Sequence, residues 1–354
     1  MKRTLLAILT SVIVLQSFAQ RVDLDRFRFS VAYRDFPDEP LPESYKTYNV
    51  RIEAAPSLGM AYDNSLTNNL IDIQGLRRVE GTGHITILAI LDDILIEKAE
   101  SRERVETKKD KQGVETKISH FSNEFVYSFS ARASVYDYKG NTILSNYILQ
   151  DRDSKKSYKT PEFGTPEEAS SYYNKKVVEI RNNISRQLVN SSLATLNGIL
   201  NRKYGYLVQR SNDILWILNN RRHPAYRDHQ KAWNSFREAI VLMNENDPVD
   251  KVREKLKPVI DYFEKAKTMY TTSSKEDRKL RYASYFNLAK IYFYLDEPEK
   301  AIREADALSM NDYDESDGRF LRSAAENLLA VLQKNNATTR HFAVNAETYE
   351  PPIR

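Results

Sequence analysis

Cysteine is absent from all 354 residues of this chain. Its absence excludes disulfide bonds, cysteine nucleophiles, cysteine ligands to zinc and lipid attachment through an N-terminal cysteine. The folded chain must therefore be held together by its hydrophobic core.

Long apolar runs are also scarce. The short run at residues 5–15 follows Lys2 and Arg3 and precedes a small-residue site that ends at Ala19, which is the pattern of a secretory signal peptide. The run is shorter than the roughly 20 residues that a membrane-spanning helix needs. We expect residues 1–19 to be a signal peptide, and the mature protein to be periplasmic or otherwise exported and not membrane-spanning.

The chain lacks an excess of charge of one sign. It carries 53 basic and 49 acidic residues, and removal of residues 1–19 with Lys2 and Arg3 leaves 51 basic residues. Such a balance gives no electrostatic basis for binding a nucleic acid. The sequence therefore predicts no nucleic-acid partner.

Catalytic and metal-binding motifs are not found. The chain has no G-x-S-x-G, P-loop or G-x-G-x-x-G motif. Its five histidines include His223 and His229, whose spacing across a proline does not place two rings on one helical face, so we expect a solvated loop there. The adjacent Asp92 and Asp93 would point to opposite faces of a strand. We therefore predict no catalytic residue, no metal site and no cofactor.

Residues 20–160 show the alternation of apolar and polar residues that is typical of β-strands. In DRFRFSVAYRDF, Phe27, Phe29, Val31 and Tyr33 occupy alternate positions. The segment GHITILAILDDILI is apolar on both faces and is predicted to be a central strand. The charged residues 97–118 are predicted to form either a solvated hairpin arm or a mobile loop, with a turn at Asp110-Lys111-Gln112-Gly113.

The sequence changes from β to α at Thr165-Pro166-Glu167-Glu168, which offers an N-cap hydroxyl, a proline at the first helical position and a glutamate at the third. We expect a helix over 166–200 whose apolar face covers the sheet. Residues 204–218 remain open between a strand followed by a helix and a helix throughout.

Beyond about residue 225 the chain is predicted to form five helices joined by short connections, at 226–245, 249–270, 276–295, 297–310 and 317–334. The expected class is thus α+β, with a β-rich domain at 20–220, its covering helix near 166–200, an all-α helical-hairpin domain at 221–340 and a flexible tail at 341–354.

The segment 282–315 resembles a tetratricopeptide repeat, a helix–turn–helix unit of 34 residues. The residues at the packing positions are of the types that this family uses: Tyr285, Leu288, Ala289, Tyr292, Ala301 and Leu308. The resemblance implies a row of helical hairpins that binds protein partners.

A second stripe on the same helix consists of Phe286, Lys290 and Phe293, about 100° from the packing stripe. In the family these positions line a concave groove for a partner, so the resemblance implies that the three residues bind a protein. The alternative is that another part of this chain covers the stripe.

Together with 22 tyrosines, which suit interfaces, these features predict a non-enzymatic accessory protein of the cell envelope. It would bind envelope protein partners through its tetratricopeptide-like and β-rich domains, within secretion or surface-assembly machinery. The alternative is a carbohydrate- or peptide-binding module, or a hydrolase, with its site on the β-rich domain.

Overall fold

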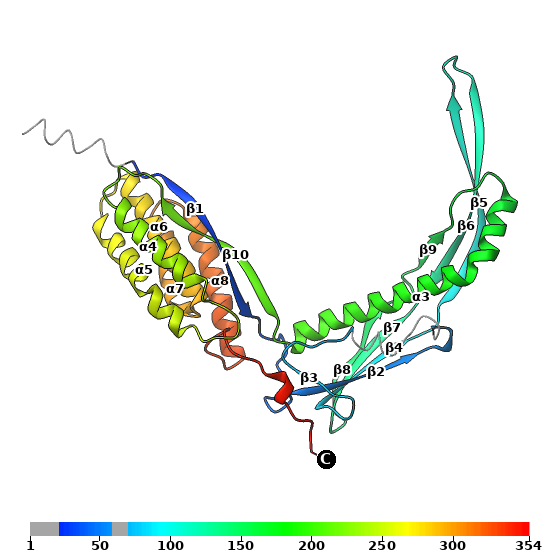
Figure 1. The fold of residues 1–354 in the computed structure, drawn as a ribbon, viewed down its shortest axis with the longest axis horizontal. Helices are drawn as coiled ribbons and strands as arrows, with labels where there is room; N and C mark the ends of the chain where they lie inside the picture. The colour runs from blue at the N-terminus through cyan, green and yellow to red at the C-terminus, as the bar shows by residue number, and fades with distance from the viewer. Residues whose placement is uncertain (1–20, 59–69, 354) are drawn as a thin grey trace, which may run out of the picture. The chain divides into compact units, whose positions relative to one another are not determined.

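The computed structural model describes residues 21–58 and 70–353, and the predicted signal peptide lies outside this part of the chain. Strands and helices in it confirm the α+β class (Figure 1). The chain forms two compact units, which are described separately. The helical unit contains the chain up to Phe36 together with Leu207–Val344, and the β-rich unit contains Pro37–Tyr206 and Asn345–Arg354.

This division differs from the boundary expected near residue 220. The strand β1 (Leu24–Arg34) pairs along its whole length with β10 (Val208–Leu218), and the antiparallel ribbon belongs to the helical unit. The apolar residues of β1 alternate as the sequence predicted, but Phe29 and Val31 pack against helices rather than in the core of the β-rich unit. Residues 208–218, left open by the sequence, are therefore a strand.

Five helices complete the part of the helical unit that the structure describes, as predicted. They are α4 (Tyr226–Ile240), α5 (Asp250–Met269), α6 (Lys275–Tyr294), α7 (Pro298–Ser309) and α8 (Glu315–Lys334). Each helix packs against the next one in the chain, and α8 also contacts α6. The ribbon lies against α4 and α6, so that the helices and the two strands share one hydrophobic core.

Two of these helices lack the side-chain cap that an aspartate before a helix commonly provides. Both α5 and α7 begin without a side-chain cap, although aspartates precede them at Asp247 and Asp296. Asp296 instead adopts a positive φ of 57° and accepts hydrogen bonds from Thr339 and Arg340. Its carboxylate is thus used to hold a later segment of the chain.

That segment is the start of the predicted flexible tail. His341 is buried and its Nδ1 lies 2.7 Å from the carbonyl oxygen of Asn244, while the Phe342 backbone N–H donates to the carbonyl of Glu245. The guanidinium of Arg340 lies over the ring of Tyr33 at 4.2 Å. The expectation of a flexible tail from residue 341 is therefore wrong at its first residues, because buried polar contacts fix them.

The β-rich unit is built on a five-stranded sheet with the order β3-β2-β4-β7-β8. These strands are β2 (Thr47–Ala54), β3 (Arg77–Arg78), β4 (Ile85–Leu91), β7 (Ala131–Asp137) and β8 (Thr142–Gln150). The strand β4 is central, as predicted. Its residues alternate between full and partial burial, so one face of the strand is more deeply covered than the other.

A single long helix, α3 (Pro166–Tyr204), covers that buried face. Its N-cap Thr165 accepts a hydrogen bond from the Glu168 backbone N–H, which confirms the predicted start. Leu193, Leu196 and Leu200 share a core with the inward side chains of β4. The predicted packing of this helix on the sheet is confirmed.

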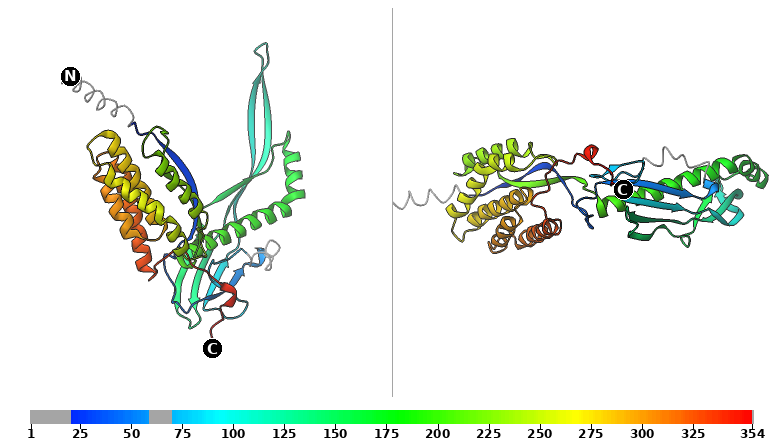
Figure 2. Two further views of the ribbon diagram at one scale, coloured as in Figure 1. Left: turned by 60° about the vertical axis from the view of Figure 1, so that its left-hand side comes forward. Right: turned by 90° about the horizontal axis from the view of Figure 1, so that it is seen from below.

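The charged segment forms a hairpin between β5 (Leu95–Lys109) and β6 (Glu115–Ser128), with the short β9 (Lys156–Lys159) beside β6. Gly113 has a φ of +83°, and the Asp110 carboxylate accepts hydrogen bonds from two backbone N–H groups in the turn. The outer part of this hairpin, residues 98–123, is called the arm. It extends beyond α3 as a two-stranded ribbon (Figures 1 and 2).

Candidate binding groove in the helical unit

The stripe of Phe286, Lys290 and Phe293 is covered largely by β10 and by the start of the tail. Phe286 is 6% exposed and packs edge-on against Trp216 of β10, with 6.1 Å between ring centroids. The Lys290 Nζ lies 2.7 Å from a carboxylate oxygen of Asp213. These contacts agree with the alternative interpretation of the sequence, in which another part of the same chain covers the stripe.

Asn287, between these residues, fixes the strand against the helix. Its amide accepts from the Trp216 backbone N–H and donates to the Trp216 carbonyl, both at 2.8 Å. A fully buried side chain thereby pairs with the backbone of β10 in place of a further strand. Such pairing removes the cost of burying unsatisfied backbone groups.

Phe293 is half-buried, and the guanidinium of Arg340 lies 4.7 Å from its ring. The same guanidinium donates to the Phe293 carbonyl and to the carboxylate of Asp296. The arrangement gives Phe293 a packing role at the point where the chain leaves the helical unit.

The packing stripe of the tetratricopeptide resemblance is buried as expected. Leu288, Ala289, Tyr292, Ala301 and Leu308 all lie in the core. Tyr285 is partly buried. Small residues where α6 meets α7 allow the two helices to approach closely.

The histidines before and in α4 are not in a solvated loop. His223 and His229 are both buried, and His229 Nε2 accepts a hydrogen bond from the Leu218 backbone N–H at 3.0 Å. Burial lowers the pKa of His229 to about 4. The ring is therefore neutral at physiological pH, and its hydrogen resides on Nδ1.

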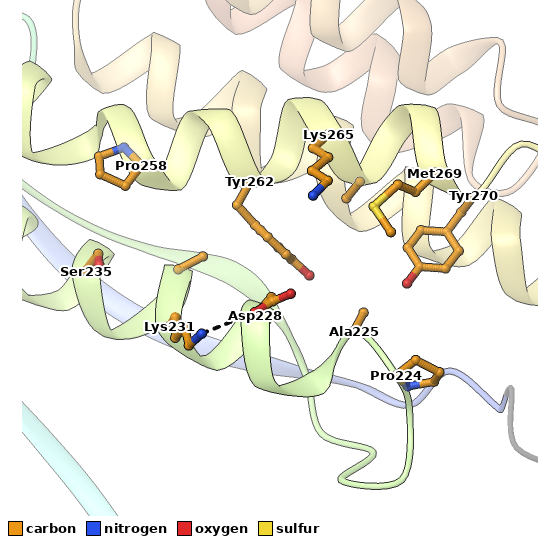
Figure 3. Close-up of a pocket in the computed structure, with 12 residues that line it drawn as sticks. Pro224, Ala225, Asp228, Lys231, Ser235, Pro258, Tyr262, Lys265, Met269 and Tyr270 are labelled. Atoms are coloured by element: carbon orange, nitrogen blue, oxygen red, sulfur yellow. Dashed lines mark hydrogen bonds and ion pairs between the residues drawn. The ribbon is translucent and has the colours of Figure 1, made fainter.

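A groove runs between α4 and α5 and encloses about 350 Å³ (Figure 3). Its apolar surface comes from small and flexible side chains, Ala225, Ala232, Ala266 and Met269. Its polar groups belong to two tyrosines, Tyr262 and Tyr270, and to three charged residues near the opening, Asp228, Lys231 and Lys265. An apolar cleft with a few polar groups is the usual form of a binding site.

Tyr262 is the polar group that the fold fixes most firmly. Its hydroxyl oxygen lies 3.3 Å from His229 Nδ1, which carries the ring hydrogen and so donates to that oxygen. The hydroxyl hydrogen of Tyr262 is then left to donate into the groove, toward which the side chain points in Figure 3. A chain of contacts thus runs from the β10 backbone through His229 to the groove.

The two tyrosine hydroxyls of the groove are neutral hydrogen-bonding groups. Burial raises the pKa of the Tyr262 hydroxyl, and burial with the nearby carboxylate of Asp277 raises that of Tyr270. Both phenols are therefore neutral donors at physiological pH, and the neutral ring of His229 donates its Nδ1 hydrogen to Tyr262. Such a site can bind carbonyl or carboxylate oxygens beside apolar side chains.

The sequence reasoning missed this groove, although a signal for it exists. Asp228, Lys231 and Ser235 on α4 lie at the positions i, i+3 and i+7, and so do Tyr262, Lys265 and Met269 on α5. Two such stripes on consecutive helices share a common opening when the helices are antiparallel.

The other acidic candidates have structural partners. Asp92 pairs with Arg132, with 3.2 Å between the charged groups, and Asp93 accepts hydrogen bonds from Ser57 and from the Ile94 backbone. Within residues 21–58 and 70–353 no group of three acidic or histidine side chains is placed to hold a metal ion. No described helix is both long and apolar enough to span a bilayer.

A smaller apolar groove lies in the β-rich unit, between the base of β5 and β6 and the first half of α3. It encloses about 260 Å³ and is lined by side chains that include Ile96, Phe125, Tyr173, Val177 and Ile184. Tyr173 stacks on Phe125 with 4.7 Å between ring centroids.

A scan against protein-family models finds no match for this chain, and no curated protein matches it either.

Proposed function

We propose that this protein is an exported, non-enzymatic accessory protein of the cell envelope that binds protein partners, within secretion or surface-assembly machinery. The helical unit holds an extended segment of a partner in the α4–α5 groove. The β-rich unit offers a second docking surface. The signal-peptide pattern of residues 1–19 supports export, with Gln20 as the first residue of the mature chain.

The observation that carries this proposal is the fixed hydroxyl of Tyr262 above an apolar groove floor. A polypeptide segment offers the complementary chemistry, since it has apolar side chains for the floor and carbonyl oxygens for the phenols. The tautomer of His229 positions the donor before a partner arrives, which lowers the entropic cost of binding.

The rim of the groove favours a segment with an acidic residue. Lys231 and Lys265 outnumber Asp228 at the opening, and Asp228 is engaged by Lys231 at 3.5 Å. Lys265 therefore remains as the charge most suited to a carboxylate of the partner.

The test is affinity purification of the tagged protein from the envelope fraction of its own cells, compared between matched variants. Ser235→Trp fills the groove, and Tyr262→Phe removes only the fixed hydroxyl. Val241→Trp places the same bulk just after the end of α4, at a position that is 77% exposed and does not line the groove.

We expect a defined protein partner to be retained by the wild type and by Val241→Trp, lost by Ser235→Trp and weakened by Tyr262→Phe. If the wild type and all three variants retained the partner equally, the groove would be excluded as the partner-binding site. Saturable binding of a glycan without any protein partner would contradict the proposed function and support a carbohydrate-binding module.

A further inference from the structure

The arm exposes a long strand edge. Among the residues that the structure describes, β5 lies at the edge of the sheet β5-β6-β9, and Lys98–Lys109 pair on one side only, with β6. A two-stranded ribbon alone is at best marginally stable in water. Its apolar side chains are also open to solvent, since Val105 is 52% and Val114 60% exposed.

The charges on β5 are not those of a strand edge that simply repels other strands. Such edges usually carry charges that obstruct pairing with any neighbour. On β5, residues of one face alternate in sign almost regularly: Lys98, Glu100, Arg102, Arg104, Glu106 and Lys108. This order can be tested for self-complementarity.

Two identical antiparallel strands in one sheet are related by a two-fold axis through one residue, which then lies opposite itself. With the axis at Arg104, Arg102 lies opposite Glu106 and Glu100 opposite Lys108. Lys98 falls opposite Asp110, the first residue after the strand. Each of these attractive pairs forms twice.

Moving the two-fold axis by one residue in either direction places like charges opposite each other. An axis at Glu103 would oppose Lys98 to Lys108, Glu100 to Glu106 and Arg102 to Arg104, all of like sign. An axis at Val105 would pair Arg104 with Glu106, but it would also oppose Arg102 to Lys108 and Glu100 to Asp110, which have like charges.

An axis at Arg102 keeps attractive pairs, but it sets Lys108 and Lys109 against Ile96 and Leu95. The register centred on Arg104 is therefore the best of these.

The one like-charged contact in that register is Arg104 with its copy at the axis. In each chain Arg104 is already paired with Glu162, since its Nε donates to Oε1 at 3.1 Å and to Oε2 at 3.2 Å, and its Nη2 donates to Oε2 at 2.7 Å. The carboxylate offsets the positive charge at the axis.

We propose that the arm is a homodimerisation element, in which β5 of two copies pair antiparallel about a two-fold axis at Arg104. The two arms then form one continuous sheet with the order β6-β5-β5-β6. The partner of this surface is a second copy of the chain, and its binding is independent of the α4–α5 groove.

The absence of cysteine allows a direct test of the register. A single Arg104→Cys substitution places a thiol opposite its own copy, within disulfide reach. We expect the oxidised full-length protein to run as a covalent dimer.

Arg102→Cys, on the same strand and face, would lie opposite Glu106 and remain uncrosslinked, and adding Glu106→Cys to it would restore the crosslink. Equal crosslinking at 102 and 104, or none at either, would overturn the proposal.

Sedimentation analysis tests the charges separately. Glu100→Lys and Lys108→Glu each turn two attractive pairs into repulsive ones, so we expect the dimer dissociation constant to rise about tenfold or more. An equimolar mixture of the two variants restores complementarity and should dimerise again.

Lys117→Glu makes the same charge change on β6, away from this edge, and should leave the dimer intact. A wild-type protein that stays monomeric at all concentrations, or a mixture that does not recover, would overturn the proposal.

Discussion

At the scale of single residues, the helical unit depends on polar side chains that complete a backbone. Asn287 is fully buried and makes both hydrogen bonds of an absent neighbouring strand to Trp216. A buried amide in such a position is more costly to lose than an apolar contact, because two backbone groups lose their partners at once.

We predict that Asn287→Leu lowers the free energy of unfolding of the helical unit by about 2–4 kcal/mol, from two unsatisfied buried groups. Both tryptophans, Trp216 and Trp233, lie in this unit, so denaturant unfolding followed by tryptophan fluorescence reports on it alone. Asn234→Leu, at an exposed position of α4, is the matched control and should change little. A loss below that of the control would show that the amide pairing is not stabilising.

His229 should make the stability of the same unit depend on pH. Its pKa is about 4 in the folded protein against 6.5 for an ordinary histidine, because burial disfavours the charged ring. Below pH 6.5 the unfolded chain binds a proton that the folded chain does not, so stability is full above pH 6.5 and falls toward pH 4. The loss is about 3 kcal/mol in all.

The measurement is tryptophan-monitored unfolding of the wild type and His229→Gln at several values between pH 7 and pH 4.5. The variant should be less stable at pH 7 and show a shallower dependence on pH. His120→Gln changes a histidine in the other unit and should leave the slope as it is. Parallel slopes for the wild type and His229→Gln would contradict the assignment of the neutral ring.

At the scale of elements, a local sequence motif determines where a helix begins if few tertiary contacts compete with it. The start of α3 is such a place, since Thr165 caps the helix and the Glu168 carboxylate accepts a hydrogen bond from the Gly164 N–H. Thr165→Ala should destabilise the first turns of α3 by about 1 kcal/mol. Faster hydrogen exchange in peptides from the start of α3, with β4 unchanged, would confirm this; unchanged exchange in both would contradict it.

The sequence predicted the five helices of the array, the central strand β4 and the covering helix, because periodicity is a local property. For the arm it left a hairpin and a mobile loop as alternatives. The unit to which β1 belongs could not be predicted. Its alternation predicts a strand, but its partner β10 lies about 180 residues further along the chain, and no local signal names that partner.

The same long-range pairing explains the stripe on α6. Phe286 and Lys290 have the pattern of a repeat groove, yet Trp216 and Asp213 of β10 cover them. The tail shows the effect again, because Arg340 and His341 lack periodicity and are nevertheless buried by contacts with Asp296 and Asn244. The α4–α5 groove was missed because its stripes are meaningful only once two helices are known to be neighbours.

At the scale of the whole molecule, each unit has its own hydrophobic core and its own exposed feature that we propose as a binding surface. The helical unit presents a groove with a fixed hydroxyl, and the β-rich unit presents a charged strand edge. Under the two proposals above, the groove would hold a segment of a partner and the strand edge would pair with a second copy of the chain.

Site-specific photo-crosslinking in living cells tests the groove as a partner-binding site most directly. A photoreactive residue would replace Ser235 or Met269 in the groove, or Val241 outside it. The account predicts that 235 and 269 capture the same envelope protein, that 241 does not, and that Tyr262→Phe weakens the capture. No crosslink from the groove positions, or the same products from all three, would contradict it.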